Sequence, residues 1–211
     1  MTNLIKNKKL TRITALLLAV AVIFGTMFSL PVSAASGDKV TITFDYCYDS
    51  AGNIIKFQQT TVSDGYTVGT VGEELCKIFA DGKEAYCIEP GHTLYSGNTL
   101  TESASTVWKN LGSAKQKAIN IALLYGKPGS EKSLSGTEDQ KWVATQLIVW
   151  EFVSGCRSTA DGYKCTNTKF IDGICAGGAN PGVKSVYNAI SKSLANYSIV
   201  PSFASAIASK A

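Results

Sequence analysis

The segment TEDQKWVATQLIVWEFVSG, residues 137–155, decides how the rest of the sequence is interpreted. Thr137 is followed three residues later by Gln140, which is the capping-box pattern of a helix N-terminus. The residues after it are predominantly apolar, and Gly155 is typical of a helix end. The segment therefore predicts one long helix over residues 138–154.

One side chain on this helix does not match its position. With about 100° of rotation per residue, Gln146 lies in the middle of the most apolar face, one turn from Trp142 and one turn from Trp150. A buried carboxamide without partners costs about 1–3 kcal/mol. Either Gln146 is hydrogen-bonded to neighbouring backbone, as buried polar groups usually are, or its carbonyl group takes part in chemistry.

The segments before residue 100 predict antiparallel strands. Residues 39–48 alternate in polarity, which indicates a half-buried strand, and residues 54–62 read as its hairpin partner. A second hairpin is expected at residues 77–80 and 83–88, which flank Asp81-Gly82, a pair preferred in two-residue turns. One face of the first strand carries Val40, Ile42, Phe44, Tyr46 and Tyr48.

After residue 100 the pattern becomes helical. Ser113 with Gln116 repeats the capping box, and Gly126 is expected to end that helix after Tyr125. Because strands precede helices, the predicted fold class is α+β, with antiparallel strands of the N-terminal half packed against a helical subdomain in the C-terminal half. The other predicted segments are a short helix within 101–110, a helix after Asn180-Pro181, and loops over 126–136 and 155–180.

Residues 1–34 have the composition of an export signal. A basic stretch, an apolar run of 18 residues from Ile13 to Leu30 and the small residues Val32-Ser33-Ala34 predict cleavage after Ala34. The alternative is an uncleaved anchor, because 18 residues are just enough to span a bilayer. We expect a secreted or cell-surface protein without membrane insertion after cleavage, with one domain over residues 35–196 and a C-terminal tail over 197–211.

The charge distribution argues against nucleic acid as a partner. Of the 20 basic residues, four lie before residue 35, where there is no acidic residue, and the remainder has 16 of each sign. A neutral remainder does not favour phosphate binding. The single histidine, His92, also argues against a His-rich metal site or a Ser-His-Asp triad.

A second segment, Tyr86-Cys87-Ile88-Glu89-Pro90-Gly91, places a cysteine near the end of a predicted strand. Free cysteine is usually a small buried hydrophobe. The expected hairpin register also sets Cys76 opposite Cys87, so a cross-strand disulfide is an alternative there.

Taken together, the two segments resemble the thioester domains of Gram-positive bacterial surface adhesins. That family is marked by an aromatic-Cys-aliphatic motif and a Thr-Gln-x-x-x-Trp motif, which are here Tyr86-Cys87-Ile88 and Thr145-Gln146-Leu147-Ile148-Val149-Trp150. The stretch LLYGKPG, residues 123–129, also looks like the family. The resemblance covers roughly residues 40–195, and departs from the family at Ile148 and in showing neither stalk domains nor a wall-sorting signal.

The resemblance implies a cross-link and a single-use reaction. The Cys87 thiol would attack the Gln146 carboxamide, expel ammonia and leave a thioester, without cofactor or metal. A primary amine, such as a lysine of a host or extracellular protein, would then take the acyl group as an amide. The implied protein is an adhesin that binds covalently and is not an enzyme. The supporting residues would be Tyr86, Thr145, and the water-excluding Trp142 and Trp150, with His92, Glu89 or Glu151 as candidate proton acceptors.

Three alternatives remain at this point. Cys87 and Gln146 can be inert in a non-covalent secreted binding module. Cys87 and His92 can serve a secreted cysteine hydrolase or transferase, although their five-residue spacing is unusual for one. The chain can also be a structural domain held by disulfides. Among the six cysteines, we expect one bridge within Cys156, Cys165 and Cys175, with Cys156–Cys175 favoured because it would tie both ends of a long loop.

Overall fold

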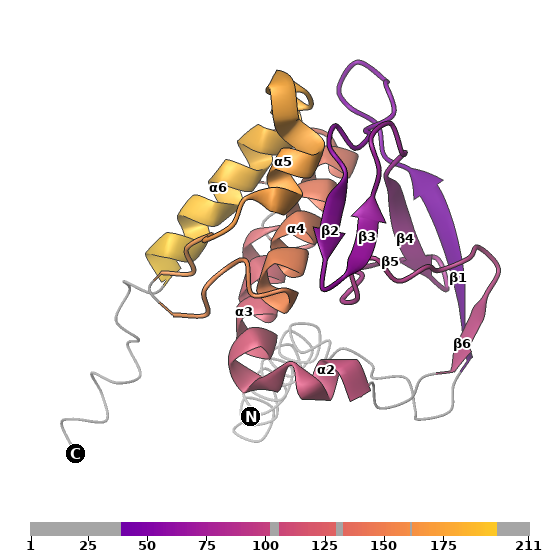
Figure 1. The fold of residues 1–211 in the computed structure, drawn as a ribbon, viewed down its shortest axis with the longest axis horizontal. Coiled ribbons are helices and arrows are strands. Elements are labelled where there is room, and N and C mark those ends of the chain that lie inside the picture. The colour runs from indigo at the N-terminus through magenta and orange to yellow at the C-terminus, as the bar shows by residue number, and fades with distance from the viewer. Residues whose placement is uncertain (1–38, 102–105, 130–132, 161, 198–211) are drawn as a thin grey trace, which may run out of the picture. The chain divides into compact units, whose positions relative to one another are not determined.

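The structure is a computed structural model that describes residues 39–101, 106–129, 133–160 and 162–197 (Figure 1). The predicted export signal and most of the predicted tail lie outside these residues. Within the described ranges, no helix is both long and apolar enough to cross a membrane.

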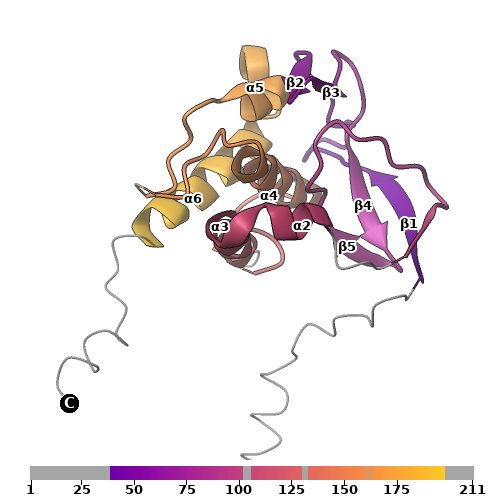
Figure 2. The ribbon, with the colours of Figure 1, turned by 60° about the horizontal axis from the view of Figure 1, so that its bottom comes forward.

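The strands form one antiparallel sheet and one separate ribbon. In the four-stranded sheet the order is β5-β4-β1-β6, and β2 pairs with β3 in the ribbon. The described helices follow in the second half of the chain and lie to one side of the sheet (Figure 2). The predicted α+β class is therefore confirmed. The strands are β1 (Lys39–Tyr46), β2 (Thr61–Ser63), β3 (Tyr66–Gly69), β4 (Cys76–Ala80), β5 (Lys83–Ala85) and β6 (Thr99–Thr101).

The end of the first strand differs from the prediction. Tyr46 and Tyr48 are 47% and 42% exposed, whereas Cys47 between them is fully buried. The Cys47 N–H donates to the carbonyl of Leu75, and its carbonyl accepts from the N–H of Ile55. The chain therefore turns its other face inward at this point, and the alternation holds only for the earlier part of β1, where Ile42 is buried.

Residues 54–62 do not form the expected hairpin partner of β1. The backbone of this segment bonds in turn near Tyr48, Glu74 and Gly173, so no continuous pairing with one strand develops. Only its end belongs to a strand, β2, which pairs with β3. The neighbours of β1 are instead β4 and β6.

The second hairpin is confirmed at its turn but is shorter than predicted. Asp81 and Gly82 have φ values of 48° and 74°, as the preferred two-residue turn requires. Pairing stops at Ala85, so the prediction of a strand through residue 88 is wrong. Cys87 lies two residues beyond the end of β5, and it forms no disulfide with Cys76.

Helix α4 is the centre of the helical half. Its capping box is confirmed, because the Thr137 hydroxyl accepts from the Gln140 N–H while Gln140 Oε1 accepts from the Thr137 N–H. It packs against α3, α5, α6 and β4. As a result, every residue from Gln140 to Phe152 is buried. The helices are α2 (Thr106–Asn110), α3 (Gly112–Tyr125), α4 (Glu138–Val153), α5 (Lys169–Cys175) and α6 (Pro181–Tyr197).

Two helix predictions need correction. The Ser113 capping box is absent, since α3 begins at Gly112 without a side-chain cap and Gln116 donates to the carbonyl of Trp108 instead. The expected loop over 155–180 contains α5 and the 3₁₀ turn η2 (Ala176–Gly178). The helix after Asn180-Pro181 is confirmed as α6.

All six cysteines belong to the described residues, and none forms a disulfide. The expected bridge within Cys156, Cys165 and Cys175 is therefore wrong. The Cys165 sulfur contacts the carbonyl of Asn167 at 3.2 Å, and the Cys175 sulfur contacts that of Asn180 at 3.7 Å. Each thiol thus points to a backbone carbonyl, and α5 supplies the order that a bridge was expected to give the loop.

Candidate functional site

Gln146 and Cys87 meet through two reciprocal hydrogen bonds. The Cys87 N–H donates to Gln146 Oε1 at 2.8 Å, and Gln146 Nε2 donates to the Cys87 carbonyl at 2.8 Å. Gln146 is 1% exposed. Its carboxamide therefore occupies the place that a neighbouring strand would take, which is why strand pairing does not continue from β5 to Cys87.

Trp142 holds the two residues before Cys87. Its indole Nε1 donates to the carbonyl of Ala85 at 3.2 Å. The ring of Tyr86 stacks on that of Trp142, with centroids 5.4 Å apart and planes 14° from parallel. Successive turns of α4 thus bind successive residues from Ala85 to Cys87, and fix the position of the cysteine backbone.

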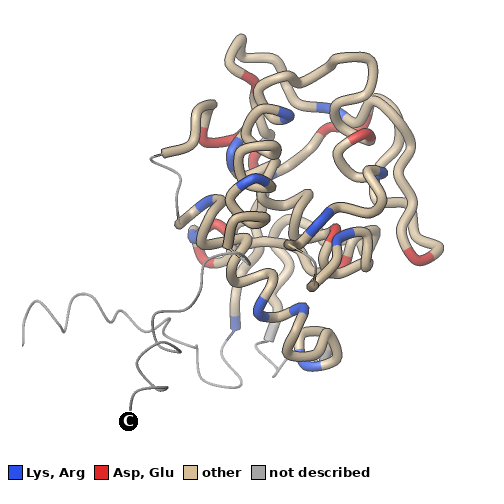
Figure 3. Tube along the Cα trace, turned by 90° about the vertical axis from the view of Figure 1, so that its left-hand side faces the viewer, with Lys and Arg blue, Asp and Glu red and all other residues tan. Residues whose placement is uncertain are grey.

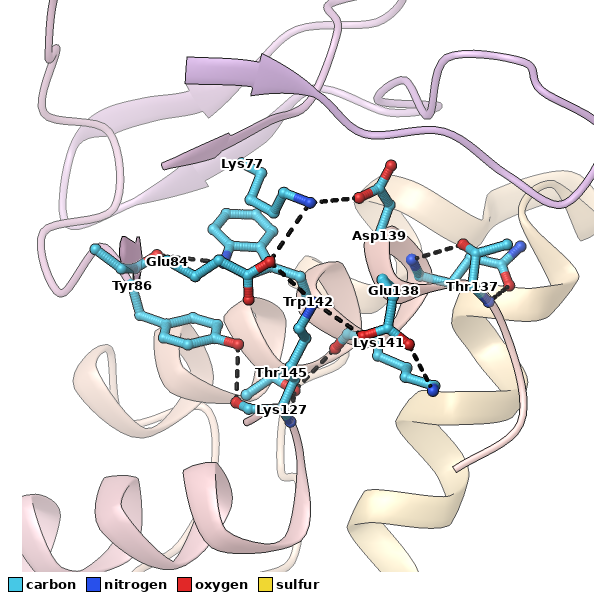
Figure 4. Close-up of polar contacts among 12 residues, drawn as sticks. Lys77, Glu84, Tyr86, Lys127, Thr137, Glu138, Asp139, Lys141, Trp142 and Thr145 are labelled. Atoms are coloured by element: carbon cyan, nitrogen blue, oxygen red, sulfur yellow. Dashed lines mark hydrogen bonds and ion pairs between the residues drawn. The ribbon is translucent and has the colours of Figure 1, made fainter. Parts of the chain in front are cut away.

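Thr145 connects the same segment to the loop after α3. Its fully buried hydroxyl accepts from the Lys127 N–H at 3.0 Å and donates to the carbonyl of Lys141 at 2.8 Å. The Lys127 carbonyl accepts in turn from the Tyr86 hydroxyl at 2.8 Å (Figure 4). Gly126 is required at this junction, because a Cβ there would come within 2.4 Å of the Thr145 hydroxyl.

An ion-pair cluster lies beside this junction (Figure 4). The Lys127 ammonium pairs with Glu84 at 2.9 Å and with Glu138 at 3.0 Å, and Lys77 pairs with Asp139. Burial alone would lower the pKa of Lys127, but the hydrogen bonds to Glu84 and Glu138 outweigh it and raise that pKa. Lys127 therefore stays charged and anchors the loop. Elsewhere along the described trace, basic and acidic residues are interspersed (Figure 3).

The Cys87 sulfur contacts one backbone unit. Its thiol donates to the Glu89 carbonyl and it accepts from the Glu89 N–H, both at 3.4 Å. Burial raises the pKa of the Cys87 thiol, and the Glu89 N–H and the indole of Trp150 act in the opposite direction. In the resting site the sulfur is therefore mainly a neutral thiol with two N–H groups near it.

A cavity of about 250 Å³ gives access to Cys87. Trp150, Phe44 and Ile78 line it, and the exposed His92 stands in its wall and packs on Tyr66 with ring centroids 4.5 Å apart. A larger hollow of about 520 Å³ lies beside Tyr46, Lys77 and Asp139, but neither Cys87 nor Gln146 lines it. Of these two cavities, the smaller one is therefore the one that reaches the Cys87 side chain.

Gly91 sets the path of the chain after Cys87. Its φ is +88°, and a Cβ at this position would lie 2.6 Å from the Cβ of Tyr66. Only glycine accepts both constraints easily. The Pro90-Gly91 turn consequently packs directly on β3 and closes one side of the cavity.

Glu151 does not serve the site as a proton acceptor, contrary to one sequence-based candidate. It is fully buried, and its two carboxylate oxygens accept from Arg157 Nε and from the Tyr187 hydroxyl, both at 2.7 Å. Its partners come from α6 and the loop after α4, so it belongs to a different cluster.

Sequence reasoning missed the central position of Lys127, the Ala85 carbonyl and the Glu89 backbone. For Lys127 a signal was present, because the stretch over residues 123–129 that contains it resembled the family. Contacts through backbone groups leave no residue-type signal, and so the other two could be found only in the structure. Among the described residues, no cluster of His, Cys, Asp or Glu has the arrangement of a metal site.

Comparison with known families assigns the chain. The family model described as Thioester domain matches residues 84–196, more than half of the chain, so the chain belongs to the thioester domain family. The match begins within β5 and includes Cys87 and Gln146. No curated protein and no solved structure matches the sequence.

Proposed function

We propose that this thioester domain joins Cys87 Sγ to Gln146 Cδ and uses the bond to attach covalently to a primary amine. The observation that carries the proposal is the pair of hydrogen bonds between the Gln146 carboxamide and the Cys87 backbone. They hold the acyl carbon beside the residue that bears the nucleophile, in a buried setting.

The contacts at the carboxamide suit each stage of bond formation. When the Cys87 sulfur attacks Cδ, negative charge develops on Oε1, which already accepts the Cys87 N–H at 2.8 Å. Such a preorganised donor stabilises a tetrahedral intermediate. The C–N bond then breaks, the nitrogen takes up the proton that the thiol lost, and ammonia leaves. The products are one thioester and one ammonia.

Capture of an amine reverses the role of the sulfur. The incoming nitrogen bonds to Cδ, the C–S bond breaks, and its electron pair leaves on Cys87. The nitrogen loses a proton and the sulfur is finally protonated, which gives an amide at Gln146 and a free thiol. Since the acyl group is consumed, each molecule reacts once, as a covalent binding module does.

The setting of this reaction is proposed from the sequence. The export signal over residues 1–34 would deliver the domain, residues 35–196, to the outside of a Gram-positive cell. The partner would be a lysine-bearing host or other extracellular protein. Its lysine would reach Cys87 through the 250 Å³ cavity, where Trp150, Phe44 and Ile78 shield the sulfur and limit hydrolysis.

Intact mass measurement of the mature protein tests the proposal. We expect a mass lower by one ammonia, and stoichiometric addition of methylamine at Gln146. Both should vanish in Cys87→Ala and in Gln146→Ala. Cys76→Ala is the matched control, because Cys76 lines the same cavity without contacting the carboxamide, and it should keep both signals.

A full unmodified mass in correctly folded wild-type protein, together with no methylamine adduct, would rule out the covalent mechanism. The protein would then be a non-covalent binding module. Repeated turnover of an ester or amide substrate that depends on Cys87 and His92 would instead indicate a hydrolase or transferase.

A further inference from the structure

Trp150 has a polar atom that the rest of the core does not explain. Its indole Nε1 is the one buried side-chain nitrogen or oxygen, among the described residues, that has no hydrogen-bond partner. The residue is 8% exposed, so water does not readily replace the missing partner. A buried donor left unpaired normally costs stability, and such a group calls for a specific reason.

The surroundings of Trp150 point to the cysteine. Trp150 lies one turn after Gln146 on α4, and it lines the same cavity as Cys87. Its ring packs on Phe170, with centroids 5.8 Å apart, which limits its freedom to turn elsewhere. Its presence also lowers the pKa of the Cys87 thiol against the effect of burial.

The other tryptophan of the same face shows the contrast. Trp142 lies one turn before Gln146, and its Nε1 donates to the Ala85 carbonyl at 3.2 Å. One indole N–H is thus used by the fold, and the other remains free beside the sulfur.

We infer that the indole N–H of Trp150 is the hydrogen-bond donor that stabilises negative charge on the Cys87 sulfur. The inference rests on the proposed function and assigns a role in the same reaction. Charge appears on this sulfur twice, when the thiolate attacks Gln146 Cδ and when an amine breaks the C–S bond and the electron pair departs with sulfur.

A neutral thiol or thioester sulfur is a weak acceptor, which accounts for the unpaired N–H in the resting site. A thiolate is a strong acceptor, so the interaction is made only as charge develops. Interactions that are stronger in the transition state than in the ground state are those that accelerate a reaction. Trp150 therefore does more than exclude water, and its nitrogen is as important as its ring.

The test uses Trp150→Phe, which keeps an aromatic ring and removes the N–H. In the Gln146→Ala background, where the thiol is free, the variant should lower the thiolate fraction of Cys87 at pH 7 about tenfold. Alkylation of Cys87 by iodoacetamide, followed by peptide mass spectrometry against pH, measures this. The alkylation rate should fall only about threefold to fourfold. The higher nucleophilicity of the more basic thiolate partly offsets the tenfold loss in thiolate fraction. Trp108→Phe, on α2 and outside the lining of the Cys87 cavity, is the matched control and should leave the Cys87 titration unchanged.

In the protein with an intact glutamine, Trp150→Phe should slow opening by methylamine about tenfold. A second measurement needs no change at Trp150. In the Gln146→Ala protein, the ¹H–¹⁵N chemical shift of the Trp150 indole should change with pH and follow the titration of Cys87. When Cys87→Ala is added, this chemical shift should no longer depend on pH over that range.

An unchanged Cys87 titration in folded Trp150→Phe, or an indole resonance that ignores the titration, would overturn the inference. These readings use a protein that cannot form the thioester. Absence of ammonia loss in the wild type would therefore refute the proposed function alone, and the thiolate measurements would still decide the role of Trp150.

Discussion

Among the polar side chains that helix α4 buries, Gln146 and Glu151 lie five positions apart, and their surroundings differ in one respect. Around Glu151 every polar group is paired: the Arg157 guanidinium binds the carboxylate, the Tyr163 carbonyl, and the hydroxyls of Tyr187 and Ser191. Around Gln146 the carboxamide is paired, but the indole N–H of Trp150 is left over beside the Cys87 thiol.

The difference separates two uses of buried polarity. In the closed cluster around Glu151, the buried donors and acceptors pair with one another, which stabilises the fold. On the proposed chemistry, the cluster around Gln146 brings together an acyl carbon, a nucleophile and an unpaired donor, so it has bonding capacity left for a reaction. Residue type alone would not distinguish the two clusters, because an ionisable Glu carboxylate is a more common catalytic group than a Gln carboxamide.

The largest expected effect tests the closed cluster. Glu151→Ala leaves the Arg157 guanidinium, which is 3% exposed, without its counter-ion, and we expect a loss of about 3–5 kcal/mol in the free energy of unfolding. Urea denaturation measures it. Glu74→Ala, which breaks the partly exposed pair with Lys56, should cost at most about 1 kcal/mol. Equal costs would remove the distinction.

A smaller loss is expected at Thr145, which supports the cluster around Gln146 and Cys87. Thr145→Val leaves the Lys127 N–H without its acceptor and should cost about 1–3 kcal/mol. It should also slow ammonia loss, because the Lys127 carbonyl holds Tyr86. Thr145→Ser keeps the hydroxyl and should restore the rate in a time course of intact mass. A variant that loses stability but not rate would show that Thr145 has no part in positioning.

Tyr86→Phe should have a weaker effect. It removes one hydrogen bond, to the Lys127 carbonyl, and keeps the ring that stacks on Trp142. We expect about 0.5–1.5 kcal/mol in stability and a complete but slower ammonia loss. Complete absence of the thioester in folded Tyr86→Phe would mean that the hydroxyl has a direct chemical role.

The smallest effect is a dependence on pH. Burial raises the pKa of free Cys87 in the folded protein above its unfolded value. The resulting stabilisation is present below the unfolded pKa, and it is lost as the pH rises through the folded pKa. We therefore compare the free energy of unfolding of Gln146→Ala with that of the double variant Gln146→Ala/Cys87→Ala. At alkaline pH, the protein with the free thiol should lose stability relative to the double variant. A difference that stays constant from pH 7 to 10 would contradict this.

Local patterns predicted those parts that depend on local contacts. The capping box at Thr137 and the helical period located Gln146 on a buried face, because both are set within one helix. The Asp81-Gly82 turn was predicted for the same reason. The family resemblance added the link between Gln146 and Cys87, which no spacing along the chain reveals.

The failures come from contacts between distant segments. Cys87 was expected on a strand, but its backbone pairs with a side chain of α4. Glu151 was a candidate proton acceptor until Arg157, in a loop expected to lack structure, proved to cover it. The Cys156–Cys175 bridge assumed that this loop needed a covalent tie, whereas α5 and buried packing already order it.

The hydrogen bonds between Cys87 and Gln146 join residues 59 positions apart. Until the hairpin and α4 have come together, the chain contains an ordinary thiol and an ordinary amide, and lysines of neighbouring proteins are safe from both. On the proposed chemistry, the electrophile arises only after folding is complete. The time at which the protein becomes reactive is thus set by its own tertiary structure, and a copy that misfolds never acquires the ability to modify the cell that made it.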